Sequence, residues 1–201
     1  MTWDFLEPDD GEDSLGLAAS FRPVPGGAAA NFEQAQAGVI RSLVSQIAEL
    51  VSADSTAAEV AETGEDDALE AELGLSTHAE IPEDPVLARL LPDGYRDDPQ
   101  ASAEFRRYTE ESLRTAKVAA AQTVLASLPA SGGEVRLSEM ECQQWLRALN
   151  DVRLALSVRL GIADENEDLS EHLAADDPRS AYVWVYQWLA YLQDSLIEAL
   201  T

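Results

Sequence analysis

Two short stretches of this sequence place arginine beside carboxylate, a combination that proteins use to bind polar or anionic groups. The first, in "PDGYRDDP", contains Tyr95, Arg96, Asp97 and Asp98. One interpretation is a substrate site formed by the carboxylates and the guanidinium group. The other is a joint between two helices, in which Asp98 caps the helix that begins at Pro99 and Arg96 pairs across the junction. We favour the joint, because an Asp-Pro pair is typical of a helix start.

The second stretch, "WLRALNDVRL", contains Arg147, Asp151 and Arg153. Asp151 follows Arg147 by four positions, so the two can pair on one helix. Arg153 lies beside an apolar stripe of the same helix and needs a carboxylate from elsewhere, because a lone buried charge is very costly. Asp97 and Asp98 are the candidates. We predict a structural network that fixes how the helices meet; the alternative is a polar pocket that holds an anion.

The sequence lacks the residue patterns of common catalytic and cofactor sites. His78 and His172 stand in acidic stretches without a metal-ligand spacing. Neither G-x-S-x-G nor G-x-x-x-x-G-K-[ST] occurs, and Lys117 is the only lysine. We therefore predict no metal, no cofactor and no enzymatic activity.

Cys142 is the only cysteine, so an intramolecular disulfide is excluded. It falls in the first turn of the helix that Ser138 is expected to cap, and a helix N-terminus lowers the pKa of a thiol. The neighbouring Glu139 and Glu141 act in the opposite direction. A buried structural cysteine is the favoured interpretation, and a reactive thiol is the alternative.

The formal net charge of the 201-residue chain is -25. The acidic excess lies in residues 1–88 and 161–201, whereas residues 89–160 are balanced. Such a charge repels nucleic acid and anionic lipid and favours a basic protein partner. No apolar run is long enough to cross a bilayer, and the chain opens without a secretory signal. These features predict a cytoplasmic protein without direct contacts to nucleic acid or membrane.

Helical periodicity and capping residues predict a mainly α fold, a helical bundle around an aromatic C-terminal helix with a minor two-stranded β element. The expected domains are a flexible acidic N-terminus, 1–13, and one helical domain, 14–201, with an acidic linker at 54–83. The expected helices are 32–53, capped by Asn31, then 84–91, which begins at the cap residue Asp84, then 99–127, 138–160 and 178–200, the last capped by Asp177. The expected strands are 15–21 and 134–137.

For two of the helices, the spacing of apolar and charged residues predicts which side chains face the core and which lie on the surface. In helix 99–127, the inner side is expected to carry Phe105, Tyr108, Ala116, Ala120 and Val124, and the outer side the pairs Arg106–Glu110 and Arg107–Glu111. The C-terminal helix is apolar on nearly every side, and Trp184, Tyr191 and Ile197 lie off its core-facing side. We predict that these three form a partner surface and that the protein is a monomer or weak homodimer.

Three segments together resemble an actinobacterial family, the domain of unknown function 2017: "PEDPVLARLLPDGYRDDPQASAEFRRYTE", "WLRALNDVRLALSVRLG" and "DDPRSAYVWVYQWLAYLQDSLIEAL". The resemblance covers roughly residues 30–200. One branch of that family is described as an oxidative-stress regulator that acts with an extracytoplasmic-function sigma factor through a cysteine switch. The resemblance thus implies a transcription co-regulator. With Cys142 alone, however, this chain cannot form the intramolecular disulfide of such a switch.

Together these observations predict a non-enzymatic regulatory protein that binds a sigma factor or another basic partner. Two alternatives stay open. One is a small ligand sensor or enzyme that uses Arg96, Asp97 and Arg153, and the other is an adaptor in regulated proteolysis.

Overall fold

The computed structural model describes residues 19–59, 81–95, 97–162, 177 and 179–201, with side chains in the first range to residue 52. The predictions for the N-terminus 1–13, for most of the linker 54–83, for Arg96 and for His78 and His172 fall outside these ranges.

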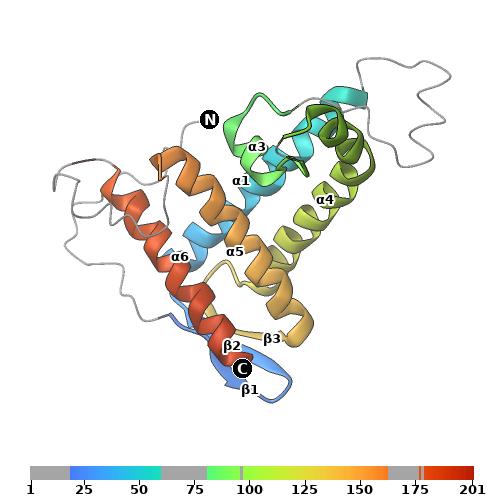
Figure 1. Ribbon diagram of the computed structural model, residues 1–201. Coiled ribbons are helices and arrows are strands. Elements are labelled where there is room, and N and C mark those ends of the chain that lie inside the picture. Colours follow the sequence, from blue (N-terminus) through green and yellow to red (C-terminus); the bar gives the residue numbers. More distant parts are fainter. Residues whose placement is uncertain (1–18, 60–80, 96, 163–176, 178) are drawn as a thin grey trace.

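The described residues form a helical bundle with a small sheet at one end (Figure 1). The helices are α1 (Gln34–Glu59), α3 (Pro85–Leu90), α4 (Pro99–Ser127), α5 (Glu139–Leu160) and α6 (Ser180–Ala199). The prediction of a mainly α fold with a minor β element is therefore confirmed. The sequence had placed the C-terminal helix at the centre. In the structure α5 packs against α1, α3, α4 and α6, whereas the main neighbours of α6 are α5, β1 and β2.

The sheet has three antiparallel strands in the order β1–β2–β3: β1 is Arg22–Val24, β2 is Gly27–Phe32 and β3 is Gly133–Ser138. The strand predicted at 134–137 is confirmed as β3. The strand predicted at 15–21 is wrong over residues 19–21, the part that the structure describes. The partner of β3 is instead β2, a glycine- and alanine-rich segment for which the sequence analysis had predicted no strand.

A tight turn and close packing explain this unexpected strand. Pro25 and Gly26 connect β1 to β2, and Gly26 has a φ of 81°, as in a turn with proline followed by glycine. A side chain at Gly27 would clash with the backbone carbonyl of Leu137 on β3. At Gly27 the two strands leave no room for a side chain, and pairing with β3 makes a strand of a segment whose alanines have no intrinsic preference for one.

Most helix starts follow the predicted caps. The Asp84 side chain accepts hydrogen bonds from the backbone at the start of α3, and Asp98 does so for α4. Ser138 and Glu141 form a reciprocal capping box at α5.

Two predicted caps differ. Asn31 lies in β2, opposite Glu134, and α1 begins at Gln34 instead. At α6 the helix begins at Ser180, and Asp177 accepts a 2.8 Å hydrogen bond from the Arg179 backbone N–H.

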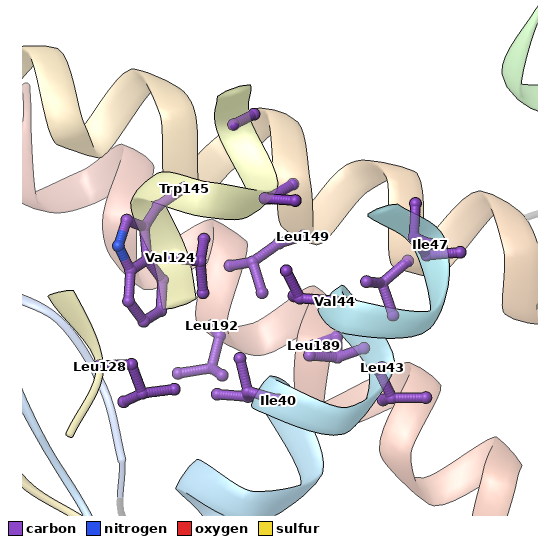
Figure 2. Packing of buried hydrophobic residues seen from close by; sticks show 14 of the residues in the cluster. Ile40, Leu43, Val44, Ile47, Val124, Leu128, Trp145, Leu149, Leu189 and Leu192 are labelled. Carbon is purple, nitrogen blue, oxygen red and sulfur yellow. The ribbon is translucent and has the colours of Figure 1, made fainter. Parts of the chain in front are cut away.

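The core lies where α1, α4, α5 and α6 meet. Figure 2 shows its central side chains, which come from all four helices: Ile40, Leu43, Val44, Ile47, Val124, Leu128, Trp145, Leu149, Leu189 and Leu192. The indole of Trp145 stacks on Phe32 and meets Phe21 edge-on, with centroids 5.9 and 5.5 Å away. Its Nε1 donates to Ser127 Oγ at 2.8 Å. Trp145 is thus one of the contacts between the sheet and the helices, alongside those of β1 and β2 with α6. None of the helices in the described ranges has the length and apolar run needed to cross a membrane.

Candidate functional site

The described residues of the loop between α3 and α4 contact α4, and none of them contacts Arg153. The Asp98 carboxylate accepts a 3.0 Å hydrogen bond from Ala101 N at the start of α4. Tyr95 is about half exposed, and its ring meets Phe105 edge-on at 6.0 Å. Asp97 is exposed, and no contact joins it to Arg153 in the described structure.

Three charged side chains of α4 are buried, at intervals of four residues. Arg106, Glu110 and Arg114 are 5%, 3% and 3% exposed. Glu110 accepts from Arg106 Nη1 at 2.9 Å and from both Nε and Nη2 of Arg114, at 2.9 and 2.7 Å. The Arg106–Glu110 pair predicted from the spacing is present, but the prediction that it faces solvent is wrong.

This buried triad (Arg106, Glu110, Arg114) joins α4 to two other segments. Arg106 donates to Asp93 at 2.7 Å and to the carbonyl of Leu91, both in the loop after α3. Burial alone would lower the pKa of Arg106, but the bonds to Glu110 and Asp93 outweigh it and raise the pKa. Arg114 Nη1 donates to the carbonyl of Val51 in α1 at 2.7 Å. The triad therefore fixes how α1, α4 and the joint meet.

The aromatic residues of α4 lie on the exposed side of the helix, away from the buried triad. Phe105 and Tyr108 are 46% and 69% exposed, and Ala116 is exposed as well, so their assignment to the inner side is wrong. Ala120 and Val124 are buried as predicted. Phe105 packs against Gly94, where a Cβ would lie 2.7 Å from the ring. The inner side of the first half of α4 is occupied by charges that find partners there, which leaves the aromatics on the surface.

Asp151 is buried, and its partner differs from the one expected. Lys117 Nζ of α4 donates to Asp151 Oδ1 at 2.6 Å, whereas Arg147 is exposed. Burial raises the pKa of Asp151, and the charge and hydrogen bond of Lys117 act against that rise. The pair links α4 to α5 across the bundle.

Arg153 bridges α5 and α6 without a carboxylate in the described structure. Its Nη1 donates to Gln193 Oε1 at 2.8 Å and its Nη2 to the Tyr186 hydroxyl at 3.4 Å. The guanidinium carbon also lies 5.1 Å from the centroid of the Tyr186 ring, a cation–π geometry. Its Nε is buried and finds no acceptor in the described part of the chain.

The outer side of α6 exposes large apolar side chains. Tyr191 and Ile197 are 48% and 49% exposed. Trp184 is half-buried and stacks on Trp188, with centroids 6.4 Å apart. The opposite side of α6 is buried in the core, as its periodicity predicted. We call Trp184, Tyr191 and Ile197 the α6 outer patch.

Cys142 is fully buried, and its thiol lies 4.0 Å from the carbonyl of Leu137. Burial raises the pKa of this thiol, and the carboxylates of Glu141 and Glu139 raise it further. A protonated, inaccessible thiol reacts slowly. The geometry agrees with the structural interpretation of the sequence analysis.

The sequence analysis missed the buried triad, Lys117 as the partner of Asp151, and the Gln193–Tyr186 pair around Arg153. One signal could have located the triad. The buried apolar positions Ala121, Val124 and Leu128 form a stripe at spacings of three and four. Extended towards the helix start, this stripe passes through Lys117, Arg114, Glu110 and Arg106 rather than through the aromatics. No comparable signal marks Gln193 or Tyr186.

In the ranges that the structure describes, no group of three or more His, Cys, Asp or Glu residues could hold a metal ion. The fold and these clusters define a helical domain whose charged groups join helices to one another. The family model "Domain of unknown function (DUF2017)" matches residues 18–200, and the chain belongs to that family.

Its relatives include proteins named "Oxidative stress regulator AosR" from Mycobacterium bovis and from two strains of Mycobacterium tuberculosis. Each is 40% identical over 148 residues, which is 67% of this chain and 66% of the relative's length. The chain thus spans about two thirds of these relatives. No solved structure matches it significantly.

Proposed function

We propose that this protein is a non-enzymatic regulator that acts through protein contacts and binds a basic partner at the α6 outer patch. The observation that carries the proposal is the exposure of Tyr191 and Ile197 on a helix whose other side is core. Large aromatic and aliphatic side chains that stay exposed on a folded domain are typical of interface centres. The relatives named "Oxidative stress regulator AosR" support a regulatory role.

Charge supports a basic partner. The chain carries a formal charge of -25, and Asp194 and Glu198 are exposed on the same helix as Tyr191. Acidic residues around an apolar centre accelerate the approach of a basic protein and repel nucleic acid. A sigma factor, the partner that the family resemblance suggests, is the first candidate. In this proposal the protein acts as a transcription co-regulator without touching DNA.

The test begins with affinity capture from the native host, followed by titration of the captured sigma factor or other basic protein with purified protein. Tyr191→Ser is expected to weaken binding by about tenfold or more, the effect of truncating an interface hot spot. The control is Tyr108→Ser, the same substitution at an exposed tyrosine on α4. Higher salt should slow the association of the wild-type protein with its basic partner.

Two results would contradict the proposal. Equal losses for Tyr191→Ser and Tyr108→Ser would show that the α6 outer patch is not the binding site. Tight binding of DNA by the protein alone at physiological salt would show that its charge does not exclude nucleic acid as a direct partner.

A further inference from the structure

A small polar hollow lies where α3, α5 and α6 meet, apart from the α6 outer patch. Arg89 of α3 lines it together with Arg153, Asn150 and Ser157 of α5 and Tyr186 of α6. Its cavity volume is about 30 Å³. One water-sized atom needs roughly 10–15 Å³ on this measure, so the hollow has room for about two such atoms.

The hollow is positively charged. Among the described residues that line it, two are arginines and none is a carboxylate. That is unusual in a chain with 38 acidic and 13 basic residues. Arg106 and Lys117 on α4 behave differently, since each contacts a carboxylate directly. The described walls of the hollow therefore contain two arginines and no carboxylate to neutralise them.

Arg153 is held in place before any ligand arrives. Gln193 accepts from Arg153 Nη1, and Gln193 itself is fixed by donating from Nε2 to the carbonyl of Leu146 at 3.2 Å. The Tyr186 ring supports the guanidinium from one side. Yet Arg153 Nε is buried and has no acceptor among the residues that the structure describes. Buried donors in folded proteins are almost always paired, so this Nε–H calls for an acceptor that the described residues do not supply.

We propose that this hollow is a binding site for the carboxylate group of a small organic acid, with Arg153 and Arg89 as its cationic ligands. A carboxylate has two oxygen atoms, which matches the available space. It also supplies the negative charge and the acceptor atoms that the described residues do not offer to the two arginines. A phosphate group carries four oxygens and is too large to enter whole. A neutral amide of the same shape would leave the charge uncompensated. The site goes beyond the proposed partner binding and gives the protein a small-molecule ligand.

The probe is sodium acetate, and the readout is the side-chain Nε–H signal of Arg153 in a proton–nitrogen correlation spectrum. Arg153→Lys assigns the signal by removing it. Acetate should shift this signal saturably with a Kd of about 1–10 mM, a reasonable range for a ligand of four non-hydrogen atoms. Sodium chloride at the same ionic strength, inorganic phosphate and acetamide are the comparison titrations. Phosphate should bind more weakly than acetate, and chloride and acetamide should give no saturable shift.

The variant that tests the site is Arg89→Gln, because Arg89 is exposed and its loss does not threaten folding. It should weaken acetate binding at least tenfold. Arg147→Gln removes the same charge from an exposed position on α5 outside the hollow and should change the affinity less than twofold. No saturable acetate shift, an equal response to chloride, tighter binding of phosphate, or equal affinities in the two variants would each overturn the proposal. None of these results depends on the α6 outer patch, so the proposed partner binding is tested separately.

Discussion

Replacing Glu110 by glutamine tests the buried triad most directly. The substitution keeps the shape of the side chain, so no cavity is created, but it removes the only negative charge between Arg106 and Arg114. Glu110 accepts three hydrogen bonds from these arginines, and its side chain is 2% exposed. Glutamine has one acceptor oxygen, and its amide group would point donors at donors.

The size of the effect follows from burial. Breaking a buried ion pair by removing one partner costs about 3–5 kcal/mol, because the remaining charge stays in a poorly solvated place. Asp93 stays beside Arg106, so the low end, about 3 kcal/mol, applies. For a chain of this length each kcal/mol lowers the Tm by about 2–4 °C. We therefore expect Glu110→Gln to lower the Tm by about 6–12 °C.

The assay is thermal unfolding at neutral pH, followed by circular dichroism, with Glu111→Gln as the matched control. Glu111 is the next residue of α4 and is exposed, so the same chemical change there should alter the free energy of unfolding by less than about 0.5 kcal/mol. If the pair faced solvent, as its spacing alone suggested, the two variants would be almost alike, because an exposed pair contributes about 0.3–0.5 kcal/mol. A difference in Tm below about 2 °C would refute the burial of the triad.

Three further predictions concern α4 and α5. Lys117→Met should destabilise the protein by about 3 kcal/mol in urea unfolding at pH 7, because Asp151 would stay buried without its cation. Burial already raises the pKa of Asp151. The Asp151 carboxylate therefore takes up a proton at a higher pH in the folded protein than in the unfolded chain. The stability lost through Lys117→Met should therefore shrink as the pH falls through that raised pKa. A loss of stability that grows on acidification would contradict the assignment of Lys117 as the partner of buried Asp151. Cys142 should resist alkylation in the native protein and react only after unfolding; rapid native labelling would show that the thiol is accessible. Ser138→Ala should lower the free energy of unfolding by about 1 kcal/mol through loss of the helix cap, and an unchanged urea midpoint would contradict the role of the capping box with Glu141.

The helix starts and the overall charge could be read from the sequence alone. Asp84, Asp98 and Ser138 cap the helices that follow them, as their positions predicted. A cap depends on hydrogen bonds between residues two or three apart, so the local sequence contains all of its partners. Charge and the absence of common catalytic motifs are likewise properties of composition and spacing.

The tertiary structure decided what depends on distant partners. The alanine-rich segment Gly27–Phe32 becomes a strand because it pairs with β3, more than 100 residues further along the chain. Arg106 faces inward because Asp93 and Glu110 are there to receive it. Arg153 pairs with Gln193, and among the described residues with no carboxylate, because α6 packs on α5. Helical spacing predicts which residues share a face of a helix. Whether that face points to the core or to solvent depends on contacts between elements far apart in sequence, and local preferences do not include the free energy of those contacts.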